Sequence, residues 1–319
     1  MPAVAGKKIL ITGATGQTFR PIAEAFAKQN EVWCLGRFSE PSVRQDLDAQ
    51  GITTHVWNMG VDDLAGVPRD FTHVLHAATL RGTDDPEEVM SINGVGTGML
   101  MEHCRSAEAF LCVSTFGVYR HIAPDHRYTE TDPVSGDTPS LPSYATTKII
   151  EEGVVRAYAR TAGVRSTIAR LNTGYGPKGL GGMPVRFFRM MQAGEPIVVP
   201  LDGHDEWHNM IHTDDLLDQI PQLWDIAATT PPVVNWAGDD YISIREMTDY
   251  VSEITGVPVR HQPSEVTLAP KASDNSRRLA LIGPCRMRWH EGVHKAIEAH
   301  FPGATRPAAA SADRTGDDK

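Results

Sequence analysis

Short apolar runs alternate with amphipathic stretches along the first half of the chain. Six of these runs predict buried strands, at residues 7–12, 31–35, 54–57, 72–76, 110–115 and 165–171. The stretches at about 17–28, 86–105 and from 143 onward carry apolar residues at helical spacing. Strands that alternate with helices predict an α/β fold built on a parallel sheet.

A glycine-containing turn joins the first predicted strand to the first predicted helix. Residues 13–16 read GATG; Gly13 lets the chain turn tightly, and Gly16 lets backbone N–H groups approach a pyrophosphate at the helix N-terminus. This order is typical of a dinucleotide site in a Rossmann-type, doubly wound sheet. The pattern's third glycine is replaced by Phe19, which we expect to shift the helix outward without removing phosphate binding. A plain strand–helix turn is the alternative.

The strict alternation ends near residue 174. A helix is expected at about 183–193, a second from Thr213, its N-cap, to about 226, and a third after Ser243, which forms a capping box with Glu246. We therefore predict a dinucleotide-binding domain at 1–174 and a smaller mixed α/β substrate-binding region at 175–303. The Ala-, Asp- and Gly-rich tail at 304–319 is predicted to be disordered.

The end of the second strand bears on the choice of dinucleotide. A carboxylate there would bind an adenosine ribose and repel a 2′-phosphate, but the chain has Gly36 and Arg37. A guanidinium pairs well with a phosphate, so we predict NADP, with NAD as the alternative. A solvated arginine at a strand end would also explain Arg37.

Hydroxyl groups and one cation mark a candidate site for proton transfer. Tyr144 and Lys148 lie about one turn apart on one helix face, and a nearby ammonium favours the phenolate of a tyrosine. Alone, this spacing also fits an amphipathic helix with a solvated lysine. Ser114 and Thr115 end the strand at 110–115, where ligands bind in open parallel sheets. His76, inside an apolar strand, is expected to be a packed core histidine.

Composition excludes several classes of partner. The formal net charge of −10 argues against nucleic acid, and there is no apolar run long enough to cross a membrane. The four cysteines lack metal-like spacing, and Cys34 and Cys112, which lie in apolar strand patterns, suit buried thiols in a reducing compartment. His208 and His212, followed by two aspartates, do not predict a metal, because no helix would place the pair on one face. We expect a cytoplasmic protein with a small-molecule substrate.

Seven features occur in one order along the chain. They are GATG at 13–16, Ala77 with Ala78, Asn93, Ser114 with Thr115, Tyr144 with Lys148, Arg170 followed by YGP at 175–177, and IHTDD at 211–215. Together they resemble the extended short-chain dehydrogenase/reductases, a group that includes nucleotide-sugar epimerases and dehydratases. The resemblance covers about residues 7–300.

This resemblance implies roles for individual residues. Tyr144 would be the general acid/base, Lys148 would favour its phenolate and bind the nicotinamide ribose, and Thr115 would orient the substrate oxygen. The residues expected to contact the cofactor are Gly13, Thr15, Gly16, Gln17, Arg37, Asn58, Ala77, Ala78, Asn93, Tyr144 and Lys148. The family also suggests a homodimer through the helices at 86–105 and 143–161.

Departures from the family pattern narrow the expected reaction. Dehydratases carry an Asp-Glu pair after the catalytic threonine, where this chain has Phe116 and Gly117. Epimerases often carry Arg-Asp-Phe where this chain has HNM at 208–210. We therefore predict an NADP-linked oxidoreductase acting on a small carbonyl or alcohol, with a nucleotide-sugar epimerase or 4-reductase as the alternative. A catalytically silent dinucleotide sensor is disfavoured, because a sensor needs no proton donor.

Overall fold

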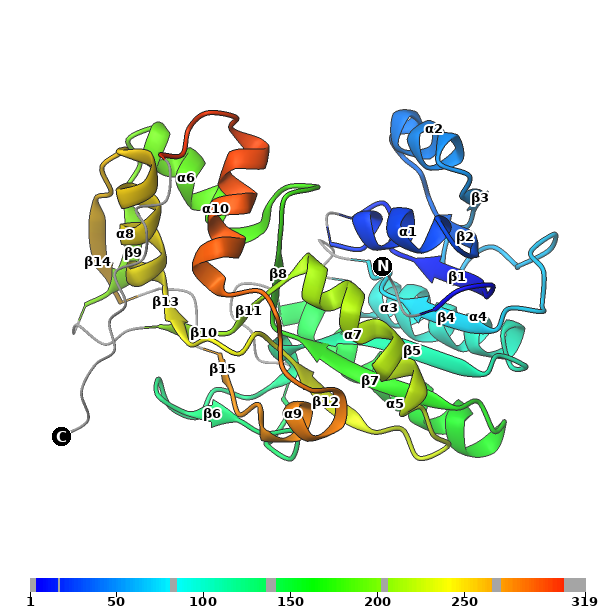
Figure 1. The fold of residues 1–319 in the computed structure, drawn as a ribbon. Helices are drawn as coiled ribbons and strands as arrows, with labels where there is room; N and C mark the ends of the chain where they lie inside the picture. The colour runs from blue at the N-terminus through cyan, green and yellow to red at the C-terminus, as the bar shows by residue number, and fades with distance from the viewer. Residues whose placement is uncertain are drawn as a thin grey trace.

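The computed structural model describes residues 4–16, 18–80, 85–135, 142–201, 206–265 and 271–306. Its centre is a seven-stranded parallel sheet with the order β12-β7-β5-β4-β1-β2-β3 (Figure 1). The strands are β1 (Lys8–Thr12), β2 (Glu31–Gly36), β3 (Thr53–Val56), β4 (His73–His76), β5 (Ala109–Thr115), β7 (Ser166–Leu171) and β12 (Val233–Trp236). The predicted fold class is confirmed, and all six strands predicted before residue 174 are present within a residue or two of their expected bounds.

Both faces of the sheet are buried. Along β1, Ile9 and Ile11 pack into one core cluster and Leu10 into another, because successive side chains of a strand point to opposite faces. The first cluster includes residues of α1 and α7, and the second includes residues of α4 and α5. Coverage by helices on both faces explains why the strands read as continuous apolar runs.

The helices beside the sheet have the following bounds. They are α1 (Arg20–Ala27), α2 (Pro41–Ala49), α3 (Pro86–Val89), a π-helical segment (Met90–Val95), α4 (Gly96–His103), a 3-10 turn (Phe116–Val118), α5 (Pro142–Thr161) and α7 (Thr213–Asp225). The helix predicted at 86–105 is thus interrupted by a π-helical turn. Segments of this kind occur frequently at functional sites.

Glycines at the π-helical turn allow close packing. A Cβ on Gly96 would lie 2.8 Å from the backbone nitrogen of Gly60, and one on Gly94 would lie 2.9 Å from Cγ2 of Ile150. The loop after β3 and helix α5 therefore approach this turn more closely than any residue with a Cβ would permit.

The second half of the chain returns to the sheet before completing a smaller region. Strand β12 belongs to the large sheet, and helix α7 packs against one face of this sheet, although both lie beyond residue 174. The other elements are β6 (Arg127–Tyr128), β8 (Thr173–Tyr175), α6 (Gly182–Gln192), β9 (Ile197–Pro200), β10 (Trp207–His208), β11 (Met210–His212), β13 (Ile242–Ser243), α8 (Ile244–Thr255), β14 (His261–Ser264), β15 (Ala272–Ser273), α9 (Ser276–Ile282) and α10 (Trp289–His300). Helices α6, α8 and α10 share a core of their own. The domain division at residue 174 stays a prediction.

Two predicted helix caps have different outcomes. The capping box of Ser243 and Glu246 is confirmed by both of its hydrogen bonds. The prediction that Thr213 caps α7 is wrong: the N-cap is His212, whose Nδ1 accepts a hydrogen bond from the backbone N–H of Asp214. An imidazole nitrogen replaces the usual hydroxyl.

Two predictions concern residues that the structure does not describe. These are Gln17 and the predicted tail from residue 307 onward. Among the described residues, no helix is both long enough and apolar enough to span a lipid bilayer.

We predict that Gly96→Ala lowers the free energy of unfolding by about 1–3 kcal/mol, the usual cost of overpacking. The added methyl would meet the backbone of the loop after β3. Urea denaturation measures the change. Gly153→Ala in α5 is the matched control, since a Cβ at this position would have no neighbouring atom within 4 Å. We expect this variant to be neutral or stabilised by up to about 1 kcal/mol. Equal stability of the two variants would refute the packing argument.

Candidate active site

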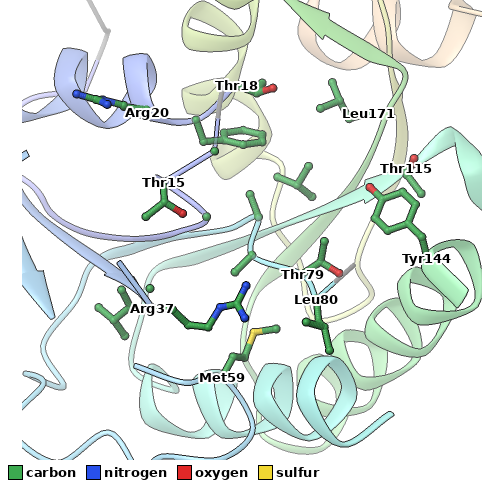
Figure 2. Close-up of a pocket in the computed structure, with 18 of the residues that line it drawn as sticks. Thr15, Thr18, Arg20, Arg37, Met59, Thr79, Leu80, Thr115, Tyr144 and Leu171 are labelled. Atoms are coloured by element: carbon green, nitrogen blue, oxygen red, sulfur yellow. The ribbon is translucent and has the colours of Figure 1, made fainter. Parts of the chain in front are cut away.

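A cleft of about 1110 Å³ lies at the carboxyl ends of the sheet strands (Figure 2). Its lining includes most of the residues that the sequence singled out: Gly13, Thr15, Gly16, Arg37, Asn58, Ala77, Ala78, Thr115, Tyr144 and Lys148. Residues far apart in the sequence meet here because parallel strands end at the same edge of the sheet.

The glycine turn after β1 forms one wall of this cleft. Gly13 has φ +81°, and a Cβ there would lie 2.7 Å from the carbonyl carbon of Ala77. Only glycine therefore allows β1 and the loop after β4 to approach at this point. The N–H of Gly16 donates to the carbonyl of Gly13 at 3.0 Å. Helix α1 begins at Arg20, three residues later than predicted.

Phe19 occupies the position of the missing third glycine. Its ring is buried and lies 6.5 Å, between centroids, from the ring of Trp236 on β12. The side chain thus contributes to the core on this face of the sheet. With Phe19 in this position, Gly13, Thr15 and Gly16 of the turn still line the cleft.

A chain of hydrogen bonds runs behind the cleft through His76. Thr97 Oγ1 donates to the Asn93 carbonyl at 2.6 Å, so it accepts from His76 Nε2 at 2.9 Å. With the ring proton assigned to Nε2 on this ground, Nδ1 accepts from Thr12 Oγ1 at 2.8 Å. Burial lowers the pKa of His76 to about 3, so the ring is neutral. The prediction of a packed core histidine is confirmed.

Thr12 carries this chain to the cleft wall. Its Oγ1 accepts hydrogen bonds from the backbone N–H groups of Ala77 and Ala78, at 3.2 and 3.1 Å. The two small residues after β4 are thereby held at a fixed place along the cleft.

Asn93 lies behind the cleft lining. The side chain is fully buried, and its Oδ1 accepts from the N–H of Leu80 at 2.7 Å. Its Nδ2 donates to the Leu80 carbonyl and, at 3.5 Å, to Thr147 on α5. Asn93 therefore ties the loop after β4 to α5. These contacts match a role in supporting the backbone of the loop after β4.

The two hydroxyls that end β5 have different environments. Ser114 Oγ donates to Glu152 at 2.7 Å and is committed to the core. Thr115 Oγ1 accepts from the N–H of Gly117 at 3.1 Å, which leaves its own hydrogen to donate to a ligand. In Figure 2, Thr115 and Tyr144 lie beside each other at the cleft.

Lys148 is buried and held by two acceptors. Its Nζ donates to the carbonyl of Val113 at 3.0 Å and to Glu151 at 2.7 Å. Burial is the largest single effect and lowers the pKa of Lys148, but the hydrogen bond and charge of Glu151, together with Tyr144 and Cys112, outweigh burial and raise this pKa. Burial also raises the pKa of Glu151. Because the pKa of Lys148 lies above its ordinary value, the amine is protonated near neutral pH.

A second buried ion pair lies next to the first. Arg170 on β7 donates to both oxygens of Glu152 at 2.9 and 2.8 Å. Burial opposes ionisation of Glu152, but these bonds and the one from Ser114 lower the pKa of its carboxyl. Arg170 thus anchors β7 to α5, a pairing with Glu152 that was not predicted from the sequence.

Arg37 lies on the other side of the cleft from Tyr144 (Figure 2). The guanidinium is exposed and lines the cleft. Within the described part of the chain, we find no hydrogen bond or ion pair for it. The glycine turn and this exposed cation together fit a phosphate-bearing dinucleotide.

The position where the family pattern provides an arginine carries no such charge here, and it lies outside the residues that line the cleft. His208, at the position where epimerases often carry arginine, is buried, and burial lowers its pKa to about 4. It therefore supplies no positive charge near neutral pH. Lys271, which the sequence reading missed, donates to the carbonyls of Phe116 and Tyr119 at 3.2 Å each. Burial lowers the pKa of Lys271 to about 8.

This sheet order, with a tyrosine–lysine pair beside the end of β5, is the architecture of the extended short-chain dehydrogenase/reductases. The chain belongs to the NAD dependent epimerase/dehydratase family, whose sequence model matches residues 9–230. The resemblance stated from the sequence is confirmed.

Curated relatives match part of the chain. A dTDP-glucose 4,6-dehydratase of Mycolicibacterium smegmatis is 29% identical over 183 residues, which cover 53% of this chain and 54% of that relative. UDP-glucuronate 4-epimerase 1 of Arabidopsis thaliana is 29% identical over 213 residues, covering 61% and 49%. The chain thus spans about half the length of the curated relatives it matches.

Solved structures match over nearly the whole chain. UDP-glucuronic acid 4-epimerase from Bacillus cereus, in complex with UDP-glucuronic acid and NAD, has a TM-score of 0.77 at 21% identity and covers 92% of this chain and 98% of its own. UDP-N-acetylglucosamine 4-epimerase from Methanobrevibacter ruminantium M1 has a TM-score of 0.78 at 17% identity, covering 93% and 99%. At these identities, the likeness establishes a shared fold.

Proposed function

We propose that this protein is an NAD(P)-dependent oxidoreductase that acts on a nucleotide sugar, as a 4-epimerase or a 4-reductase. The observation that carries the proposal is Tyr144 beside Thr115 in a cleft with a dinucleotide-type glycine turn. Relatives and structural neighbours that act on UDP- and dTDP-sugars support this alternative over a small carbonyl substrate.

The residues of the cleft support a simple mechanism. Thr115 donates a hydrogen bond to the reacting substrate oxygen, and Tyr144 takes the proton from that oxygen or returns it. Lys148 favours the phenolate by its charge. When bound, the dinucleotide supplies the hydride acceptor or donor at its nicotinamide. The protein's own contribution is positioning and electrostatics.

Elimination of water is disfavoured as the reaction. It requires an acid and a base next to the reacting sugar carbon, and the two residues after Thr115 are a buried phenylalanine and a glycine. The similarity to a dehydratase therefore supports the substrate class more than the reaction.

A second candidate function rests on His208. A neutral, buried imidazole at this position offers no ion pair to a nucleotide diphosphate. This observation favours the main prediction from the sequence, an NADP-linked reductase of a small carbonyl compound.

Substrate screening with a catalytic variant tests the proposal. UDP- and dTDP-sugars should raise the melting temperature of the wild-type protein and of Tyr144→Phe alike, because binding to the folded state stabilises it. Turnover should fall by about a thousandfold or more in the variant, which keeps the ring but loses the proton. Melting curves and product analysis by chromatography measure the two effects.

The outcomes separate the two candidate functions. Turnover of a small ketone with no stabilisation by any nucleotide sugar would favour the carbonyl reductase. Wild-type turnover in Tyr144→Phe would rule out both mechanisms. Tyr250→Phe is the matched control, because this tyrosine packs on Trp289 of α10, outside the cleft lining.

We further propose NADP as the preferred dinucleotide, although the family is NAD-dependent and the neighbours contain NAD. Arg37→Ser should weaken NADPH binding about tenfold or more, because it removes a charge-assisted contact to the 2′-phosphate, and should leave NADH binding within about twofold. Calorimetric titration measures both. Arg44→Ser, a nearby exposed arginine paired with Asp48, is the control. Preference of the wild type for NADH would contradict the assignment.

We also propose that the protein is a homodimer through α4 and α5. An open, largely apolar groove of about 680 Å³ runs along these helices and is lined by Met90, Val95, Met99, Ile150, Val154 and Tyr158 among others. Exposed apolar surface of this kind marks interaction sites.

A charge in this groove should separate the subunits. Val95 is 54% exposed, and Val95→Glu would place a carboxylate in the interface. Sedimentation analysis should show a wild-type dimer and a monomeric variant. Val198→Glu, at a 39% exposed position on β9, should remain dimeric. A wild-type monomer at micromolar concentration would refute this interface.

A further inference from the structure

Glu151 is a buried carboxylate for which the mechanism above has no task. Its side chain has no exposure to solvent, and its Oε2 accepts from Lys148 Nζ at 2.7 Å. Its Oε1 accepts from the hydroxyl of Thr79, a cleft residue, at 3.3 Å. Removing two ions from water costs several kcal/mol for each. A lysine that precedes its glutamate is also the less favourable order along a helix, so helix stability does not account for the pair.

The contacts of Lys148 show what Glu151 does to it. An ammonium has three N–H donors, and the Val113 carbonyl and Glu151 take two of them. Val113 belongs to β5 and Glu151 to α5, so the ammonium is held between strand and helix. Since Lys148 also lines the cleft, the third donor is directed by the other two.

The other titratable groups around this pair are either paired with another residue or uncharged. On α5, Glu152 is paired with Arg170 from β7 and with Arg156. From β4, His76 is neutral because burial lowers its pKa to about 3. From β5, Cys112 is a neutral thiol because burial raises its pKa.

Lys148 and Glu151 are therefore each other's main charge partners at this end of α5. The groups that face them from the loop after β4 and from the π-helical turn are Thr79 and Asn93, both uncharged. Tyr144 is the remaining titratable group in the electrostatic surroundings of Lys148.

We propose that Glu151 is a positioning residue for Lys148: it aims the ammonium at the ribose of a bound dinucleotide, and its charge weakens the effect of that ammonium on the Tyr144 phenol. The inference rests on the proposed dinucleotide-dependent function. It adds to the Tyr144/Lys148 pair a third member that acts through the lysine.

The positioning role predicts a coupled effect on dinucleotide affinity. NADH and NADPH are titrated against the wild type, Glu151→Leu, Lys148→Met and the double variant, with circular dichroism to check folding. Glu151→Leu should weaken binding about tenfold, in line with losing one charge-assisted hydrogen bond to the ribose. The double variant should bind as Lys148→Met does, because Glu151 acts only through the lysine.

Several results would overturn the positioning role. Wild-type affinity in Glu151→Leu would do so, as would additive losses in the double variant. Glu151→Leu alone leaves Lys148 buried and unpaired, and this variant could fail to fold for that reason. In that case the dinucleotide affinities of Lys148→Met and of the double variant, which contains neither charge, are compared. A difference in affinity between those two would show that Glu151 acts independently of the lysine.

The charge role predicts a shifted pH profile. In Glu151→Gln the hydrogen bond remains and the negative charge is lost, so the phenolate form of Tyr144 is favoured more strongly. Turnover in the direction of substrate oxidation, which rises with pH as the base forms, should reach half its maximum about one pH unit lower than in the wild type. A shift of this size follows from one charge removed at an effective dielectric constant of about 20.

A matched variant separates this effect from a general change in charge. Glu291→Gln removes a carboxylate from an exposed Lys–Glu pair on α10 and should leave the profile unchanged. An unshifted profile in Glu151→Gln would refute the charge role, while a shift to higher pH would reverse its sign. A wild type that binds no dinucleotide would overturn the proposed function itself, whereas normal binding and turnover with unaffected Glu151 variants would overturn only this inference.

Discussion

Two buried ion pairs that involve helix α5 hold the candidate active site together. Lys148–Glu151 and Arg170–Glu152 place four charged groups under the carboxyl end of β5, and each of the four side chains is less than one-tenth exposed. Charges at that depth persist only when every one has a partner. Here the partners come from α5, β5 and β7, so the electrostatic requirement also determines how the helix sits against the sheet.

Backbone geometry supplies the other half of the site. Gly13 lets β1 and the loop after β4 approach closely, and the Thr12 hydroxyl then gathers the N–H groups of Ala77 and Ala78. The same hydroxyl donates to neutral His76, whose ring leads to Thr97 and the π-helical turn. This part of the cleft wall is therefore built from short, mostly uncharged hydrogen bonds, while helix α5 is fixed by ion pairs.

The parts of this molecule that a local pattern specifies were predictable from the sequence. Strand positions, the glycine turn and the Ser243 capping box each depend on residues close together in the chain. The roles of Ser114 and Glu151 were not predictable in this way. Ser114 turns into the core because a carboxylate 38 residues later accepts its hydroxyl, and Glu151 is significant only because α5 packs against β5. The His212 cap was missed because imidazole is a rare capping group.

The charge distribution across the cleft bears on how a substrate would bind. Toward the dinucleotide side, Arg37 is an exposed guanidinium. Outside the cleft lining, at the position of the family's arginine, His208 is neutral, and the ammonium of neighbouring Lys271 is already bonded to two backbone carbonyls. Because burial lowers the pKa of Lys271 to about 8, a nearby diphosphate would favour its protonated form and gain a cation that the arginine position lacks. If the proposed nucleotide-sugar activity is correct, Lys271, which pairs with His208 in a β-bridge, is the cation beside the position of the family's arginine.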